Sequence, residues 1–420
     1  MPNRNNKFSR LFYLFITLGV ICSIGCGTEF EPVEPGLDVL VEERLGLIKN
    51  KRIGIVTNHT ALSADGEHIV DLLNRIPDVG IHALFAPEHG IRGDRAGGEY
   101  IETYEDSLTG IAVYSLYHRN RKPTAAMLDS VDILLFDIMD IGARFYTYIS
   151  TMALAMEAAA EAGIPFIVLD RPNPITGEIV EGPVLKEEHK SFVGMFPIPI
   201  RHGLTVGELA LMINGQGWLT NGIRADLTVV PVRNWKRLQW FDQTGLPWVK
   251  TSPNMPSLEA ANLYPGIGLL EGVNVSEGRG TPTPFTLIGS PWMRPGPIKE
   301  RFTGFRGFGT QLEVREFTPV PVPNAAPHPE FQDRRCRGFY LNVKNRNLFR
   351  PVSFAVQLLT VLRELHPRDL EFTSGFDRLA GDSKLQEQLL AGVPANKIIA
   401  GWSQELKKFK RMRKKYLLYE

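Results

Sequence analysis

Polar residues that can bind or catalyse follow four short apolar runs of the sequence, each at the point where a run ends. The runs have the composition of buried parallel strands. The carboxyl ends of such strands meet at one edge of a sheet, where open α/β proteins bind ligands. A single Asp or Asn at such a position could instead cap the next helix, and a single His could be structural, so the convergence of these residues is the signal. The residues that we expect at this edge are Asn58 and His59 after the first run, Glu88, His89 and Arg92 after the second, Asp137, Arg144 and Tyr146 after the third, and Asp170, Arg171 and Asn173 after the fourth.

Glu88 is the strongest candidate for acid catalysis among them. Pro87 restricts the backbone before it and Gly90 permits an unusual turn after it, so the carboxyl group is carried by a stiff loop. A carboxyl group at a partly apolar edge has a raised pKa, which suits a general acid that protonates a glycosidic oxygen. The alternative is a structural ion pair with Arg92 or Arg95.

A second polar cluster lies in the proline- and glycine-rich stretch from Ser252 to Pro282. Asn254, Glu277 and Arg279 are its candidate site residues. Rigid loops with amide, carboxylate, guanidinium and tyrosine side chains suit a sugar ligand, and they suit a scaffold between domains equally well.

The absence of several known motifs excludes some classes of enzyme. It contains no H-E-x-x-H, paired C-x-x-C, G-x-S-x-G or P-loop motif, and no G-x-G-x-x-G after the first apolar run. We therefore expect carboxylate chemistry without a metal, a nucleotide or any other cofactor.

The order of the elements indicates the fold that positions these residues. Helical spacing over residues 67–76 and 146–162 alternates with the apolar runs, and Gly163 is a natural end for the second helix. This alternation predicts a Rossmann-like, mostly parallel sheet with helices on both faces, although periodicity alone does not exclude a barrel. The predicted strands are 52–57, 80–85, 111–114, 131–136 and 165–169.

The second half of the chain has a different composition. Proline and glycine are dense from 252 to 297 and prolines recur up to 327, after which a strand is predicted over 337–343 and a helix over 353–365. We predict a Rossmann-like domain over 38–240 and a smaller mixed α/β domain over 241–420 that carries the loops of the active site.

The first 26 residues predict an export signal. Three basic residues precede an uncharged apolar stretch, Leu11–Ile21, which is too short to span a bilayer comfortably. Ser23-Ile24-Gly25-Cys26 then resembles a bacterial lipobox, with Cys26 as the lipidated residue; Cys22 is a weaker alternative, and a plain secretory signal is another. Residues 27–37 are predicted to be a tether. We expect an exported protein, lipid-anchored to a membrane of the cell envelope.

Charge and cysteine content agree with this placement. The formal net charge is +1, which gives no indication of a nucleic-acid partner. The basic run at 407–415 is typical of a solvated helix face, with contact to an anionic envelope surface as the alternative. Without the signal only Cys26 and Cys336 remain, so an internal disulfide is not expected once Cys26 is lipidated.

Several segments of the sequence resemble the exo-β-N-acetylmuramidases, a bacterial family long known only as a domain of unknown function. The resemblance extends over about residues 38–420. The segments that carry it are 54–60 (GIVTNHT), 87–93 (PEHGIRG), 136–148 (FDIMDIGARFYTY), 169–174 (LDRPNP), 252–256 (SPNMP), 271–281 with its two Glu-Gly pairs, and 415–419 (KYLLY).

The resemblance implies a function and a catalytic residue. It implies a Rossmann-like domain and a smaller domain with a cleft between them, and release of N-acetylmuramic acid from the non-reducing end of peptidoglycan fragments without metal or nucleotide. Glu88 is the implied catalytic residue. The positions of the other candidates, rather than the resemblance, suggest that Asp137, Asp170 or Glu277 assists water or steadies the developing charge, unless the substrate's own acetamido group does so. Arg144, Arg171 or Arg279 would bind the lactyl carboxylate, because a guanidinium matches a carboxylate bidentately.

Two other functions are also compatible with these residues. A lipoprotein that binds muropeptides or sugars without catalysis would use the same rim of polar residues. An amidase or deacetylase would act on the same polymer but release a peptide or acetate.

Overall fold

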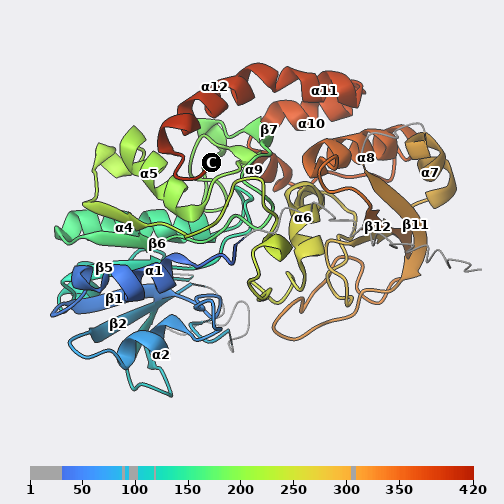
Figure 1. Ribbon diagram of the computed structural model, residues 1–420. Coiled ribbons are helices and arrows are strands. Elements are labelled where there is room, and N and C mark those ends of the chain that lie inside the picture. The colour runs from blue at the N-terminus through green and yellow to red at the C-terminus, as the bar shows by residue number, and fades with distance from the viewer. Residues whose placement is uncertain (1–30, 88–89, 94–102, 118–119, 304–308) are drawn as a thin grey trace, which may run out of the picture. The chain divides into compact units, whose positions relative to one another are not determined.

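The computed structural model describes residues 31–87, 90–93, 103–117, 120–303 and 309–420, and Glu31–Glu420 form one compact unit (Figure 1). The expected signal peptide, the lipidation site Cys26 and the alternative Cys22 lie outside the described residues. No helix within the described ranges is long and apolar enough to cross a membrane.

A seven-stranded sheet forms the first part of this unit. Its strands run in the order β3-β4-β2-β1-β5-β6-β9, and every neighbouring pair is parallel except β3 and β4. The strands are β1 (Arg52–Thr57), β2 (Gly80–Ala86), β3 (Thr103–Glu105), β4 (Ala112–Ser115), β5 (Ile133–Asp137), β6 (Phe166–Leu169) and β9 (Leu227–Val230).

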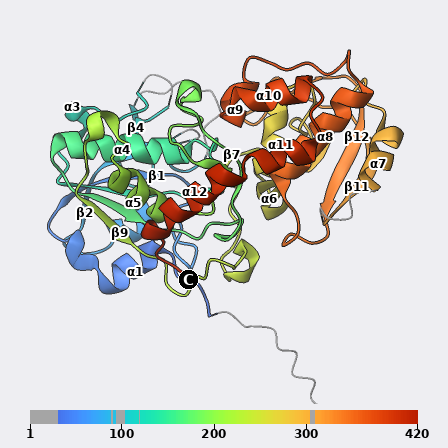
Figure 2. The same ribbon diagram turned by 90° about the horizontal axis from the view of Figure 1, so that it is seen from above.

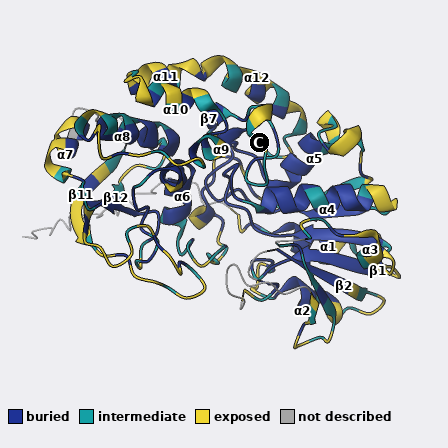
Figure 3. Cartoon of the chain, turned by 180° about the vertical axis from the view of Figure 1, so that it is seen from behind, coloured by how far each residue is buried: buried dark blue, intermediate teal, exposed yellow. Residues whose placement is uncertain are grey.

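Helices cover both faces of this sheet, because alternate side chains of each strand point to opposite faces. Ile53 and Ile55 of β1 belong to one apolar cluster, together with residues of α1 (Gly36–Glu43) and α2 (Ile69–Asn74). Val56 belongs to the other cluster, together with residues of α4 (Tyr148–Ala162) and α5 (Val206–Gln216). Figure 3 shows α4 buried along most of its length. This is the doubly wound arrangement that the sequence predicts.

The second part of the unit is built on a smaller antiparallel sheet in the order β10-β12-β11. Its strands are β10 (Leu287–Ser290), β11 (Thr310–Phe317) and β12 (Cys336–Val343), and α8 (Pro351–Leu365) packs against α6 (Leu258–Ile267). The remaining elements are α3 (Ala125–Leu128), α7 (Pro295–Thr303), α9 (Phe376–Ala380), α10 (Ser383–Leu390), α11 (Ala395–Gly401), α12 (Ser403–Arg413), the antiparallel pair β7 (Glu181–Val184) and β8 (Pro199–Arg201), and the 3₁₀ turns η1 (Leu45–Leu47), η2 (Glu187–His189), η3 (Thr220–Gly222), η4 (Phe241–Gln243), η5 (Gly268–Gly272) and η7 (Lys414–Tyr416).

The last residues of the chain return to the first sheet, as Figure 2 shows for α12 and the C-terminus. Tyr419 Oη donates to Asp170 Oδ2 at 2.5 Å, beyond the end of β6. In the basic run, Lys407, Lys408, Lys410 and Arg411 are exposed, as on a solvated helix face. Arg413 is an exception because its buried guanidinium donates to the carbonyls of Gly177, His202 and Gly203.

The predicted α/β fold class is confirmed, with differences at the edges of the sheet. All five predicted strands are present within a few residues, and Gly163 ends α4 in the left-handed conformation with φ 69°. The sheet is open, so the barrel alternative is wrong. The sequence did not reveal β3, a three-residue antiparallel strand, or β9, a four-residue strand at the other edge.

Candidate active site

A cavity of about 430 Å³ lies where segments from both halves of the chain come together. Residues 145–148 contribute from the loop before α4 and from its first turn, and residues 252–255 contribute from the loop before α6. Tyr264, Glu271 and Arg279 supply further functional groups to the cavity lining. The volume is in the range of pockets that hold small molecules.

Aromatic rings form much of the cavity wall. Tyr264 packs edge-to-face on Tyr146 and on Phe285, with ring centroids 5.8 and 4.7 Å apart, and Tyr146 packs on Tyr148 at 5.0 Å. Tyr146 Oη donates to Thr251 Oγ1 at 2.6 Å, and Tyr148 Oη donates to the Thr251 carbonyl at 2.7 Å. Burial raises the pKa of both Tyr146 and Tyr264, so these hydroxyls stay protonated. Rigid rings of this kind suit a sugar, which offers apolar faces as well as hydroxyls.

A charged group lies in the same wall. Arg279 Nη1 is 3.1 Å from Glu271 Oε2 and 3.0 Å from Glu277 Oε1. The side chain of Glu277 is almost completely buried. The side chains of Glu271 and Arg279 are 27% and 28% exposed and line the cavity. Glu277, a candidate from the sequence, instead lines an adjoining hollow of about 350 Å³. Asn254 lines the cavity and donates from Nδ2 to the Ala325 carbonyl at 2.6 Å.

The ends of β1 and β5, where the direction of strand order reverses, are joined by a hydrogen-bond network. Thr60 donates to Asn58 Oδ1 from both its backbone N and Oγ1, at 3.0 and 2.6 Å, and Thr60 Oγ1 accepts from Met139 N at 2.9 Å. Asn58 is fully buried, and its Nδ2 has no hydrogen-bond partner in the described part of the chain. The network holds two strand ends together at the expected ligand-binding crevice.

Asp137 and Arg171 join the ends of β5 and β6 as a buried ion pair. Arg171 Nε and Nη2 both donate to the Asp137 carboxylate, the second at 2.9 Å, and Nη2 also donates to the Leu62 carbonyl at 2.9 Å. The two side chains are 0% and 7% exposed, respectively. Neither residue lines the cavity.

Asp170 has a complete set of donors. Its carboxylate accepts from the backbone N of Arg171 and Gly207 and from the hydroxyls of Thr205 and Tyr419, at 2.5–2.9 Å. Burial nevertheless raises the pKa of Asp170 to about 7. These contacts attach α5 and the C-terminus to the end of β6, and the residue lies outside the cavity wall.

The side chains of Arg144 and Asn173 also form hydrogen bonds with the backbone. The buried Arg144 guanidinium donates to the carbonyls of Pro183, Ile198, Leu379 and Ala380 at 2.7–3.0 Å. Asn173 donates to the Leu204 carbonyl and accepts from Ile175 N. Burial lowers the pKa of Arg144 to about 9.

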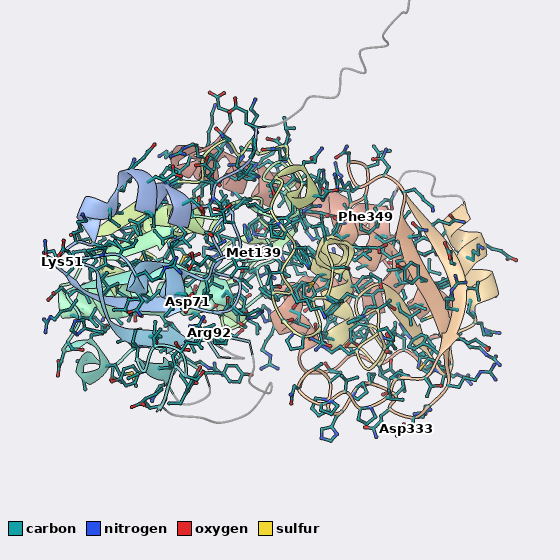
Figure 4. All side chains as sticks on the ribbon, turned by 60° about the horizontal axis from the view of Figure 1, so that its bottom comes forward. Lys51, Asp71, Arg92, Met139, Asp333 and Phe349 are labelled. Atoms are coloured by element: carbon teal, nitrogen blue, oxygen red, sulfur yellow. The ribbon has the colours of Figure 1, made fainter. Side chains whose placement is uncertain are left out.

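Arg92 lies beside Asp71 in Figure 4. Its Nη1 is 2.6 Å from Asp71 and its Nη2 is 3.0 Å from Asp106, so it closes a local cluster with α2 and the β3–β4 turn. These two carboxylates raise the pKa of Arg92. Arg92 is not part of the cavity wall.

Glu88 and His89 lie outside the described residues, but the flanks of their segment contact the surroundings of the cavity. The Ala86 carbonyl, at the end of β2, accepts from Leu116 N at 2.7 Å, next to Tyr117 of the cavity wall. On the other flank, Gly93 has φ +72°, and a side chain there would collide with the His59 ring at 2.7 Å. His59 Nε2 pairs with the Lys250 carbonyl at 2.6 Å, immediately before the cavity loop.

Comparison with known proteins identifies the family. Residues 53–259 match the family model described as exo-beta-N-acetylmuramidase NamZ, N-terminal, and residues 262–419 match the model for its C-terminal part. The chain is also 44% identical over 389 residues to the peptidoglycan beta-N-acetylmuramidase NamZ of Bacillus subtilis (strain 168), which covers 92% of this chain and 91% of that relative. The chain belongs to the exo-β-N-acetylmuramidase family.

Solved structures of the DUF1343 family share the fold of this muramidase-family chain. Two are from Bacteroides fragilis NCTC 9343. One has a TM-score of 0.85 at 34% identity and covers 92% of this chain and 99% of its own, and the other has a TM-score of 0.76 at 35% identity with 93% and 99% covered. The resemblance found in the sequence motifs is therefore confirmed for both family and fold.

Asp140 is a functional candidate that the sequence did not single out in this muramidase-family chain. The residue follows β5, its side chain is buried, and its Oδ1 accepts from Gly142 N at 2.7 Å. Its Oδ2 has no hydrogen-bond partner among the described residues. Burial raises the pKa of Asp140 to about 7, and its charge also raises the pKa of the cavity tyrosines Tyr146 and Tyr264.

We expect Asp140→Asn to stabilise the protein at high pH relative to the wild type. The pKa of Asp140 is higher in the folded than in the unfolded chain, so its contribution to stability is lost as pH rises from about 4 to about 7. An amide mimics the neutral acid, so the variant should gain about 2–3 kcal/mol over the wild type between pH 5 and pH 8. Urea unfolding at both pH values measures this, with the exposed Asp65→Asn as control. A difference that stays constant between the two pH values would disprove the buried-acid interpretation.

Two further cavity residues, Tyr264 and Glu271, lie in the polar stretch from Ser252 to Pro282 but were not chosen as site residues from the sequence. Tyr264 and Glu271 lie within segments that carry the family resemblance or adjoin it, yet nothing in their spacing distinguishes them from core residues. Tyr264 packs against Tyr146, more than a hundred positions away, and Glu271 pairs with Arg279 at the same cavity. Among the described residues, no group of three or more histidine, cysteine, aspartate or glutamate side chains is placed to hold a metal ion.

Proposed function

We propose that this chain is an exo-acting glycosidase that releases N-acetylmuramic acid from the non-reducing end of peptidoglycan fragments. The observation that carries the proposal is the 44% identity to a peptidoglycan β-N-acetylmuramidase across 92% of the chain. The cavity supports it, because its aromatic wall and its arginine suit a sugar ring that bears a carboxylate.

Glu88 is the proposed general acid. It would protonate the leaving glycosidic oxygen while positive charge develops at the anomeric carbon. The contacts of Ala86 and Gly93 support this role, because both flanks of its segment adjoin the surroundings of the cavity.

The three carboxylates expected as its partner are held by other groups. Asp137 is paired with Arg171, Asp170 accepts from four donors, and Glu277 is paired with Arg279. The stereochemistry of the product separates the remaining routes. Direct attack by water inverts the anomeric centre, whereas a protein nucleophile or the substrate's acetamido group gives retention. Proton NMR of the first product formed distinguishes these outcomes.

Incubation of the purified protein with a chromogenic β-N-acetylmuraminide and with muropeptide fragments tests the proposed activity. Free N-acetylmuramic acid is the expected product. Release of a peptide or of acetate would instead support the amidase or deacetylase alternative, and binding without any product would support a sugar-binding lipoprotein.

We further propose that the protein is exported and lipid-anchored through Cys26 to a membrane of the cell envelope. The basic, apolar and small-residue order of residues 1–26 supports this. Durable anchoring needs more than one acyl chain, because each buried methylene contributes only about 0.8 kcal/mol.

Cys26→Ser is expected to abolish incorporation of an alkyne-labelled fatty acid and to move the protein from the detergent phase to the aqueous phase. Cys22→Ser is the matched control and should keep both properties. Labelling that persists in Cys26→Ser would refute lipidation at this residue, and labelling lost only in Cys22→Ser would assign it to the alternative site.

A further inference from the structure

Of the three arginines expected to recognise a lactyl carboxylate, Arg279 is the one that reaches the cavity. Arg144 donates from Nη1 and Nη2 to four backbone carbonyls, and Arg171 is paired with Asp137 and the Leu62 carbonyl. Arg279 lines the cavity with 28% of its side chain exposed. Its guanidinium carbon lies 5.0 Å from the centroid of the Phe285 ring, which supports the group from one side.

Arg279 also has an unused edge. Both of its ion pairs involve Nη1, and among the described residues its Nε and Nη2 make no hydrogen bond. These two nitrogens form the fork that binds a carboxylate bidentately. The structure therefore offers a donor pair that is positioned by Glu277 and Phe285 but not consumed by them.

The charge around Arg279 sets a condition on any anionic ligand. One guanidinium already serves two carboxylates, Glu271 and Glu277, so this trio carries a net charge of −1 when all are ionised. A bound carboxylate would bring the total to −2 in a partly enclosed wall. Like charges at such short range are unfavourable, and one of the carboxylates relieves this by taking up a proton.

We propose that Arg279 binds the lactyl carboxylate of N-acetylmuramic acid and that Glu271 takes up one proton when it does. This inference rests on the proposed function for the identity of the sugar. Arg279 and Glu271 then act together as a specificity site: a sugar without the lactyl group gains nothing from Arg279 and causes no proton uptake.

The surroundings of Glu271 make it the acceptor of that proton. Arg279 and Glu277 face it from the loop before β10, Tyr264 faces it from α6, and His328 lines the adjoining hollow with it. Loss of solvent around the carboxyl raises the pKa of Glu271, the charge of Arg279 lowers it, and the charge of Glu277 raises it. A further ligand carboxylate acts in the same direction as Glu277.

Glu330 also lines the hollow with Glu271 and is a further competitor for the proton. Partial burial and the charge of Glu277 raise the pKa of Glu330, and Arg334 lowers it. Glu330 does not line the cavity that holds Arg279 and Glu271, so a ligand carboxylate on Arg279 affects it less. Glu330→Gln is accordingly the matched control for Glu271→Gln.

The experiment is isothermal titration of the full mature chain with free N-acetylmuramic acid. At one pH, titrations in buffers that differ in ionisation enthalpy give the number of protons taken up. We expect uptake approaching one proton at pH values where Glu271 is ionised in the free protein, and there the affinity falls by about tenfold per pH unit. N-acetylglucosamine should bind without proton uptake.

Two variants and one control variant assign the groups. Glu271→Gln, which mimics the protonated side chain, should bind N-acetylmuramic acid without proton uptake and with an affinity independent of pH, whereas Glu330→Gln should behave as the wild type. Arg279→Lys keeps the charge but loses the fork, so the preference for N-acetylmuramic acid over N-acetylglucosamine should fall by about tenfold or more.

Proton uptake that persists in Glu271→Gln, or wild-type binding without proton uptake, would overturn the inference. These results are independent of turnover. A wild-type protein that releases N-acetylmuramic acid but shows no linkage leaves the proposed function intact and removes this inference. A protein whose binding of N-acetylmuramic acid is coupled to proton uptake, but which shows no turnover, would overturn the proposed function and leave this inference in place.

Discussion

Glu88→Gln is expected to lower kcat for N-acetylmuramic acid release by about 10²–10⁴-fold, the contribution of a positioned general acid. Glutamine has nearly the same shape but no proton to give to the leaving oxygen. The effect should therefore fall on kcat, with KM changed much less, because the aromatic wall and Arg279 are untouched.

The leaving group provides a sharper readout for the same variant. An aryl muraminide with a strongly acidic phenol needs little protonation, so Glu88→Gln should lose much less activity on it than on a muropeptide. Glu105→Gln, an exposed glutamate on β3, is the matched control and should behave as the wild type. Equal losses on both substrates, or a kcat within tenfold of the wild type on muropeptides, would remove Glu88 from the acid role.

The sequence predicted the centre of the fold better than its edges. The strands β1, β5 and β6 are continuous apolar runs because both of their faces are covered, and such runs are recognisable without knowledge of their neighbours. At the edges, β3 has only three residues and no buried ones. Its existence depends on pairing with β4, and a pairing partner is not encoded in local pattern.

For a related reason, the sequence indicated which polar residues lie at one edge of the sheet but not which of them line the cavity. Polar residues do gather at the carboxyl ends of neighbouring strands, since β2, β1, β5 and β6 are adjacent in the sheet. Many of their side chains, however, use each other and the backbone as partners, as Asp137 does with Arg171. Sequence patterns name residues with suitable chemistry. They do not show which of these residues hold the loops in place through their hydrogen bonds and ion pairs. The cavity wall at Tyr264 and Glu271, in addition, depends on contacts between segments that are distant in the sequence.

Arg171→Leu is expected to have the largest effect on stability. The variant removes the cation from a pair whose side chains are 7% and 0% exposed, and it leaves the Asp137 carboxylate buried beside apolar atoms. Breaking a buried ion pair from one side costs about 3–5 kcal/mol, because the remaining charge keeps its desolvation penalty. The hydrogen bond to the Leu62 carbonyl is lost as well. Urea unfolding at neutral pH measures the change in the free energy of unfolding.

The double variant Asp137→Leu/Arg171→Leu separates a structural from a ligand-binding role for this pair. Replacing both partners removes the isolated charge, so we expect it to recover much of the stability lost in Arg171→Leu. Because neither side chain lines the cavity, the folded double variant should bind N-acetylmuramic acid with an affinity close to that of the wild type. If Arg171 instead held the lactyl carboxylate, affinity would fall by a similar factor in the single and the double variant, although the double variant recovers stability. A fall in affinity that survives the recovery of stability would return Arg171 to the binding site and weaken the assignment of that role to Arg279.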